Sequence, residues 1–314
     1  MSNTPVMDRW IRKTVETHLP WNVHLDLTYR CNERCIHCYL DHKDYGEMTT
    51  AEVEDVLKQL AAAGTLFLTL SGGEIFLRND LFELIAFARR LHFDVSLKSN
   101  ALLIDRNRAR RMRELSVRGI QVSIYSAETE VHDAITKVRG SLERSLAAIH
   151  LLLEQGLRVK LACPLMKQNL TAYRGVQDLA EQLGVPYVLD LTITPKMDGD
   201  AGILSLRNPA VELLPILKDS RVNPQSCARD EVPAQPLAAG SATSSGFESQ
   251  AYDDIPCSAG HNSCYISPYG DVFPCVQMPV PTGNVRRQRF EEIWNGSPEM
   301  KRVRNIRESQ LPVC

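Results

Sequence analysis

The chain has 314 residues, of which 44% are hydrophobic, and 36 Lys and Arg against 38 Asp and Glu give a formal net charge of −2. This length predicts about two domains, and the hydrophobic share is enough to bury a sizeable core. The charge balance lacks the basic excess of most nucleic-acid binders, which argues against DNA or RNA as a substrate.

The N-terminal segment, residues 1–20, is polar and charged and lacks the apolar region of a signal peptide. No stretch of the sequence approaches the ~20 apolar residues that a membrane-spanning helix needs. We therefore expect a cytoplasmic protein that does not contact a membrane.

Short apolar runs alternate with amphipathic stretches between residues 22 and 195. We predict strands at residues 24–28, 66–70, 93–98, 120–125, 158–163 and 187–193. We predict helices at residues 49–63, 79–91, 105–118, 141–155 and 171–183, the first capped by Thr49 or Thr50. This repetition predicts a parallel sheet with helices outside it, either a barrel or an open doubly wound sheet. In both folds ligands bind beyond the carboxyl ends of the strands.

The C-terminal third differs in composition. Residues 223–255 are rich in Pro, Ala, Ser, Gly and Gln, which predicts a flexible linker or long loop. The remainder contains four cysteines, a hairpin turn at Tyr269-Gly270-Asp271 and a helical stretch at residues 290–306. We divide the chain into a segment 1–20, a core 21–222, a linker 223–255 and a cysteine-rich region 256–314.

Three of the nine cysteines lie in one loop after the first predicted strand, where Cys31, Cys35 and Cys38 have the spacing C-x3-C-x2-C. In a cytoplasmic chain, such clustering indicates metal or redox chemistry rather than disulfides. Three thiolates suit a cubane iron–sulfur cluster that leaves one iron open. The alternative is a zinc site, which needs four ligands and would have to include His37 or His42.

This loop, followed by the aromatic Tyr39, resembles the signature of the radical S-adenosylmethionine (SAM) superfamily. The resemblance implies that Cys31, Cys35 and Cys38 hold a 4Fe–4S cluster whose open iron binds the amino and carboxylate groups of SAM. It also implies that an electron cleaves the sulfonium and that the released 5′-deoxyadenosyl radical takes a hydrogen atom from the substrate. It assigns no catalytic acid or base.

Further motifs carry the same resemblance. Ser71-Gly72-Gly73-Glu74 is similar to the family's Gly-Gly-Glu motif, in which the carboxylate pairs with a ligand ammonium. Ser123 resembles a polar position on the fourth strand, with a buried structural hydroxyl as the alternative. Arg139 resembles an arginine that pairs with the SAM carboxylate, with a solvated surface charge as the alternative. The SAM-binding residues implied by the resemblance are Tyr39, Gly72, Gly73, Glu74, Ser99, Asn100, Ser123 and Arg139.

The expected fold is therefore α/β, a partial (β/α)6 TIM-like barrel followed by a small cysteine-rich extension. Region 256–314 resembles the auxiliary-cluster extension called SPASM or its shorter relative, twitch. Cys257, Cys264, Cys275 and Cys314 are enough for one auxiliary 4Fe–4S cluster. Either Cys314 completes that cluster, or the sequence is truncated and Cys314 belongs to a second one. A structural zinc site of four cysteines is the alternative, and the isolated Cys163 and Cys227 receive no role.

Within the resembling group, modification of ribosomally made peptides or proteins is the common reaction, and we take it as our first expectation. Such an enzyme needs an electron donor such as flavodoxin or ferredoxin, and a peptide substrate needs direct docking or a separate recognition protein. The alternative is dehydrogenation, epimerisation or side-chain modification of a small molecule or cofactor precursor. Two hypotheses of other classes are a non-catalytic iron–sulfur electron carrier and a zinc-stabilised interaction protein.

Overall fold

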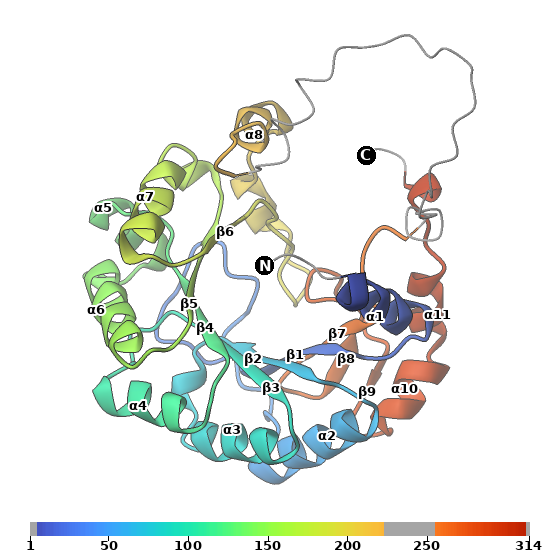
Figure 1. The fold of residues 1–314 in the computed structure, drawn as a ribbon. Helices are drawn as coiled ribbons and strands as arrows, with labels where there is room; N and C mark the ends of the chain where they lie inside the picture. Colours follow the sequence, from blue (N-terminus) through green and yellow to red (C-terminus); the bar gives the residue numbers. More distant parts are fainter. Residues whose placement is uncertain (1–4, 223–254, 312–314) are drawn as a thin grey trace.

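The computed structural model describes residues 5–222 and 255–311, so Cys227, Cys314 and residues 223–254 of the predicted linker lie outside the described residues. Within these ranges one sheet of nine strands has the order β6-β5-β4-β3-β2-β1-β7-β8-β9. The sheet curves around an interior, and helices α2 to α7 cover its outer side (Figure 1).

The strands are short and follow the predicted positions closely. Their bounds are β1 Asn22–Thr28, β2 Phe67–Gly72, β3 Asp94–Ser99, β4 Gly119–Ser123, β5 Val159–Pro164, β6 Tyr187–Asp190, β7 Ser263–Ile266, β8 Asp271–Phe273 and β9 Gly283–Asn284. Strands β1 to β6 are parallel to their neighbours, which confirms the six predicted strands and the parallel sheet. Since β6 and β9 are the two ends of the sheet, the barrel is partial.

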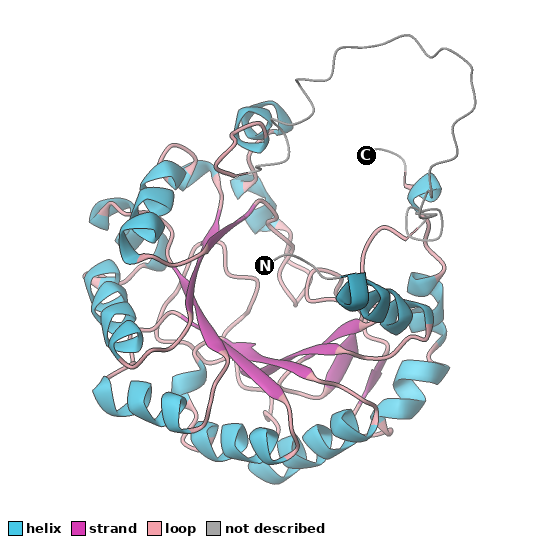
Figure 2. Ribbon diagram, viewed as in Figure 1, coloured by secondary structure: helices cyan, strands magenta, loops and turns pink. Residues whose placement is uncertain are grey.

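The helices alternate with the strands, as Figure 2 shows. Their bounds are α1 Pro5–Glu16, α2 Thr50–Ala62, α3 Leu81–Arg90, α4 Arg106–Glu114, α5 Thr129–Thr136, α6 Ser141–Glu154, α7 Tyr173–Leu183, α8 Ala210–Leu217, α10 Phe290–Gly296 and α11 Pro298–Arg304. Short 3-10 turns lie at Ile75–Leu77, Lys167–Asn169, Gly202–Leu206 and Glu308–Gln310. In the two described ranges, no helix combines the length and apolarity needed to cross a membrane.

The two faces of the sheet differ in polarity, as strand β1 illustrates. Val23, Leu25 and Leu27 are fully buried in the core between sheet and helices. Because side chains alternate along a strand, His24 and Asp26 point to the opposite face, which is the barrel interior. The core therefore lies outside the sheet, and the interior is left for polar side chains and ligands.

Two local sequence signals act at helix ends. Thr49 caps α2 and forms a capping box with Glu52, which confirms the predicted cap. The helical stretch predicted at residues 290–306 is confirmed, but it is divided into the two helices α10 and α11. Pro298 cannot continue α10, since it lacks a backbone N–H, and instead begins α11 behind the capping side chain of Ser297.

The cysteine-rich region extends the barrel sheet. Strand β7 pairs parallel to β1, with Val23 opposite Cys264 and Leu25 opposite Ile266. Strands β7 and β8 form the predicted hairpin, and β9 adds to it antiparallel. The tail and the barrel therefore share one hydrogen-bonded sheet.

A buried chain of hydrogen bonds crosses this junction inside the barrel. The Tyr265 hydroxyl donates to Asp26 Oδ2 at 2.9 Å, and lies 2.8 Å from the Tyr29 hydroxyl. His24 Nε2 lies 3.0 Å from Asp26 Oδ1. Asp26 is fully buried, so these partners replace the water that its carboxyl group loses on folding. The chain fixes β7 against β1.

Removal of the Tyr265 hydroxyl tests this junction. We expect Tyr265→Phe to lower the free energy of unfolding by about 2 kcal/mol, because a hydrogen bond to a charged group contributes about 1.5–3 kcal/mol. The matched control is Tyr269→Phe, which removes a hydroxyl that donates to the Lys43 carbonyl near the surface, and should cost about 0.5 kcal/mol. Anaerobic urea unfolding measures both values, and equal losses would contradict the role given to Tyr265.

Candidate active site

The three loop cysteines line one cavity of about 520 Å³ at the carboxyl ends of the strands. The loop is attached to α5, where Arg34 N donates to the Thr136 carbonyl at 3.1 Å and Ile36 N to the Ile135 carbonyl at 3.0 Å. Cys38 N also donates to the Cys35 carbonyl at 3.1 Å. These backbone bonds hold the thiols without a helix or strand in the loop.

The cavity keeps these thiols protonated unless a cation is present. Burial raises the pKa of Cys31 to about 12 and that of Cys38 to about 11. Burial also raises the pKa of the Cys35 thiol, which lies 3.6 Å from the Tyr125 hydroxyl. A coordinated metal deprotonates a thiol outright, so only metal ions would make these groups thiolates at neutral pH.

The donor set fits a cluster better than a single ion. In the described part of the chain, no three His, Cys, Asp or Glu side chains are grouped closely enough to hold one metal ion. A zinc site needs its ligands to converge on one ion. A cubane instead takes each cysteine at a different iron, so its three sulfurs stand further apart. Cys31, Cys35 and Cys38 line one cavity together, as the three thiol ligands of one cubane must.

Two buried polar atoms beside the thiols lack a partner. Glu33 Oε1 and His37 Nδ1 form no hydrogen bond within the described chain, and both residues line the cavity. Burial raises the pKa of Glu33 to about 7 and lowers that of His37 to about 4. Buried polar atoms are normally paired, so these two indicate a ligand in the cavity. Sequence reasoning overlooked Glu33 and considered His37 only as a zinc ligand, although both lie between the cysteines.

Gly72 and Gly73 bring the end of β2 against the cysteine loop. Gly72 has a φ of +134°, and a Cβ on either glycine would overlap the carbonyl oxygen of Thr28 or Arg30. Gly73 N donates to the Thr28 carbonyl at 2.7 Å, and Glu74 N to the Arg30 carbonyl at 2.9 Å. The glycines are therefore needed for contact between two backbone segments as well as for space at the cavity that both line.

Glu74 is fully buried and bonded within the protein. Its carboxylate accepts hydrogen bonds from the Ser99 hydroxyl at 2.8 and 3.0 Å, from Asn100 N at 3.0 Å and from Phe76 N at 3.0 Å. These bonds join the end of β2 to the end of β3. Glu74 does not line the cavity as Gly72 and Gly73 do, so its contact with a ligand ammonium stays a prediction.

The other predicted SAM-binding residues divide into two groups. Tyr39, Ser99, Asn100 and Ser123 line the cavity with the cysteines. Arg139 is exposed on the turn before α6 and does not line it, so its pairing with the SAM carboxylate also stays a prediction.

The tail cysteines lie around the β7–β8 hairpin. Cys264 is buried in β7, Cys257 is exposed just before it, and Cys275 follows β8. The antiparallel register brings Cys264 and Cys275 to the same end of the hairpin. Val276 and Gln277 line the cavity, so this part of the tail borders the barrel interior.

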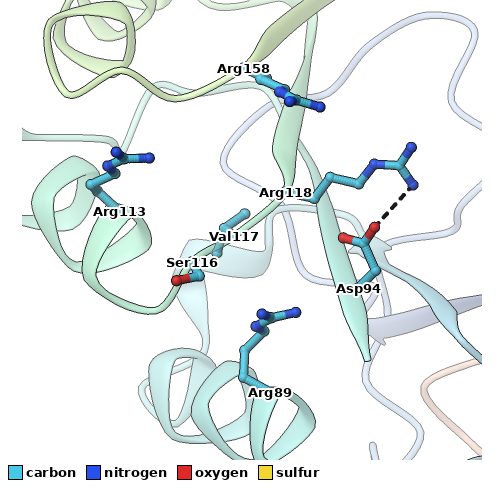
Figure 3. Close-up of a pocket in the computed structure, with 7 residues that line it drawn as sticks. All are labelled: Arg89, Asp94, Arg113, Ser116, Val117, Arg118 and Arg158. Atoms are coloured by element: carbon cyan, nitrogen blue, oxygen red, sulfur yellow. Dashed lines mark ion pairs between the residues drawn. The ribbon is translucent and has the colours of Figure 1, made fainter. Parts of the chain in front are cut away.

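A second hollow, of about 650 Å³, lies at the opposite end of the strands (Figure 3). Arg118 pairs there with Asp94 at 3.3 Å. The other lining residues are Arg89, Arg113, Ser116, Val117 and Arg158. Charged groups that face water need no ligand, and none of the predicted site residues lines this hollow. The chemistry therefore belongs to the smaller cavity.

Family models match both parts of the chain. A model of the radical SAM superfamily matches residues 25–179, and a model of the SPASM iron–sulfur cluster-binding domain matches residues 257–314. Between them they include all three loop cysteines and all four tail cysteines.

Proteins of several activities resemble the chain. The AdoMet-dependent heme synthase of Methanosarcina barkeri is 28% identical over 307 residues, covering 93% of this chain and 87% of that protein. The mycofactocin maturase MftC of Mycobacterium tuberculosis is 26% identical over 289 residues, covering 89% and 71%.

A solved structure confirms the expected fold. Streptococcus suis SuiB bound to SAM has a TM-score of 0.71 at 16% identity, covering 97% of this chain and 74% of SuiB. Taken with the family matches, this likeness identifies the chain as a radical SAM enzyme with a SPASM domain, whose cofactors are SAM, its 4Fe–4S cluster and an auxiliary iron–sulfur cluster.

Proposed function

We propose that Cys31, Cys35 and Cys38 hold the SAM-binding cluster of a peptide- or protein-modifying enzyme. Tyr39, Ser99, Asn100 and Ser123, beside the Gly72-Gly73 backbone, would contact SAM, because they line the same cavity as the thiols. Once bound, the cluster and SAM supply a 5′-deoxyadenosyl radical that removes a hydrogen atom from the substrate. Glu74 would act chiefly by joining β2 to β3, and Arg139 would need to turn inward to reach SAM.

The protein's own task is to position the substrate and to exclude other hydrogen donors. Tyr125 is fully surrounded, and burial raises the pKa of its hydroxyl well above the usual range. Leu189 of β6 and Ile193, which follows the strand, form an apolar part of the cavity wall. These groups give the radical an apolar wall on one side of the cavity, where no O–H or S–H donor competes with the substrate.

The tail would hold the auxiliary cluster through Cys257, Cys264 and Cys275, with Cys314 as the fourth ligand in a single-cluster form. We propose that the core 21–222 holds the SAM-binding cluster and that the tail 256–314 holds the auxiliary cluster. The two regions nevertheless share one sheet. Partners that this function needs are an electron donor such as flavodoxin or ferredoxin and, for a peptide, a recognition protein.

Strand β6 supports a peptide substrate. It is an end strand of the sheet, and no strand pairs with its outer edge in the part of the chain that the structure describes. Val188, Leu189 and Asp190 of β6 line the cavity. An extended peptide can add to such an edge through backbone hydrogen bonds and place one side chain in a neighbouring pocket.

The size of the cavity is the observation that favours a peptide substrate. Its 520 Å³ lies within the range of about 300–1,000 Å³ that holds one drug-sized ligand. SAM is itself a ligand of that size, so a substrate that inserts one side chain suits this cavity better than a second large rigid molecule. SuiB with its precursor peptide SuiA, which has this fold at a TM-score of 0.69, is a precedent for a peptide.

One observation favours a second candidate, modification of a porphyrin. The similarity to AdoMet-dependent heme synthases extends over nearly the whole chain, as it does for the mycofactocin maturases. For a porphyrin to fit beside SAM, β6 at the open edge of the sheet would have to move and enlarge the cavity.

A direct comparison tests the substrate class. Reconstituted enzyme, dithionite and SAM are incubated without oxygen with a short peptide encoded beside this enzyme's gene, or with Fe-coproporphyrin III. We expect a mass change in the peptide and none in the porphyrin. A modified porphyrin with an unchanged peptide would replace the proposed function by the second candidate.

Loss of one loop thiol tests the cluster assignment. We expect Cys35→Ala to lose about four iron atoms per chain and all 5′-deoxyadenosine release, because the cluster would keep only two protein ligands. The matched control is Cys163→Ala, which removes a buried thiol on β5 that is not among the proposed ligands, and should keep both. Iron analysis and chromatography of the nucleoside measure the outcome, and release by Cys35→Ala would refute the assignment.

Loss of a tail thiol should separate the two clusters. We expect Cys264→Ala to lower the auxiliary iron content while SAM cleavage without substrate continues, because the loop cluster keeps its ligands. Since Cys264 is buried in the core, Cys257→Ala at the exposed position serves as a second variant that leaves the packing intact. Unchanged iron in both variants would contradict the tail assignment.

A further inference from the structure

Three polar side chains form a row across the inner face of the barrel. Lys98 of β3 pairs in register with Gln121 of β4, and Gln121 pairs with Lys160 of β5. All three line the cavity that contains the loop cysteines. Neighbouring strands lie about 4.8 Å apart, so the two lysine backbones are about 10 Å apart. Two lysine side chains can reach across that distance to contact the same small ligand group.

The row lies deeper than the proposed SAM contacts. Lys98 precedes Ser99 by one residue, and Gln121 precedes Ser123 by two, in strands that rise about 3.3 Å per residue. A group bound at the row would therefore lie below SAM, toward the amino ends of the strands. This is the position from which a substrate can extend upward to the reacting atoms.

Neither lysine has a partner of opposite charge in contact. Within the described residues, neither Lys98 nor Lys160 forms a hydrogen bond or an ion pair shorter than 4 Å. Burial lowers the pKa of Lys98, although the charges of Asp26 and Asp190 act in the opposite direction. Asp26 is already bonded to Tyr265 and His24, and Asp190 accepts a hydrogen bond from Thr192 N.

An ammonium group that has lost water without gaining a partner is costly. Lys98 is half-buried, whereas Lys160 is exposed, as are Arg113, Arg118 and Arg158 of the second hollow (Figure 3). Lys98 faces the cavity beside a second lysine, whose like charge lowers its pKa further. An anion from outside the chain would give Lys98 the partner it lacks and would also lie within reach of the exposed Lys160, and Gln121 between them can donate one more hydrogen bond.

We propose that Lys98, Gln121 and Lys160 bind a carboxylate of the substrate and so fix which of its C–H bonds faces SAM. This inference rests on the proposed function, under which the carboxylate is an acidic side chain or the C-terminus of a peptide. The row is a specificity site: a substrate without a carboxylate at the right distance leaves Lys98 without an ionic partner.

Lysine labelling tests the site without knowledge of the full substrate. The reconstituted holoenzyme is treated with acetic anhydride, and mass spectrometry measures the rate at each lysine. We expect N-acetylglutamate to slow labelling of Lys98 and Lys160 several-fold, and the neutral analogue N-acetylglutamine to leave it unchanged. Lys58, exposed on the outer helix α2, is the control and should react equally in all samples. Equal protection by both compounds, or protection by SAM alone, would overturn the proposal.

Substrate kinetics provide a second, separate measurement. With a peptide that the enzyme modifies, we expect Lys98→Met and Lys160→Met each to raise KM about 10-fold or more, because a charged hydrogen bond of about 1.5–3 kcal/mol is lost. Replacing the peptide's acidic group by its amide should raise the KM of the unaltered enzyme equally, and Lys58→Met should change nothing. An unchanged KM in both lysine variants would refute carboxylate binding by the row, while the proposal that the enzyme modifies peptides would stand. If N-acetylglutamate slows the labelling of the lysines but the enzyme modifies no peptide, only the proposal of a peptide substrate is refuted.

Discussion

The contact between the end of β2 and the start of the cysteine loop is the constraint on which the active site depends. Glu74 N bonds to the Arg30 carbonyl one residue before Cys31, and the Glu74 side chain bonds to Ser99 and Asn100 at the end of β3. Asn100 Nδ2 then donates to Asn32 Oδ1 in the cysteine loop at 2.7 Å. Three strand ends thus form a closed circuit of hydrogen bonds. A circuit of this kind holds the thiols in place before any cofactor binds. The loop therefore loses less conformational entropy when the cluster binds.

The second constraint is that the tail continues the barrel sheet. Because β7 pairs with β1, the tail cannot move as a separate body without breaking a ladder of parallel hydrogen bonds. The buried Asp26 and Tyr265 add a polar connection, which is stronger in a low-dielectric interior than in water. Cys275 is close enough for its charge to act on the pKa of Lys98 in the barrel interior. A substrate held by the lysine row would therefore lie between the two cluster regions.

Much of this was accessible from the sequence, because strand and helix periodicity is local. The six parallel strands and the motifs at their ends follow from runs of five or six residues. The break at Pro298 was not predicted, although proline cannot extend a helix. The pairing of β7 with β1 had no local signal, because it joins residues more than 230 positions apart. The row of Lys98, Gln121 and Lys160 depends on register, which is set only when the three strands assemble.

The polarity of the interior links stability to function. A TIM-type barrel is usually filled by branched apolar residues, whereas here His24, Asp26, Ser71, Lys98 and Gln121 occupy inward positions on β1 to β4. The apolar core on the outer face must therefore supply most of the hydrophobic stabilisation. Buried unpaired atoms such as Glu33 Oε1 and His37 Nδ1 oppose it until ligands bind. Since a ligand that binds only the folded state stabilises that state by mass action, cofactors and substrate are part of what holds this barrel in its working form.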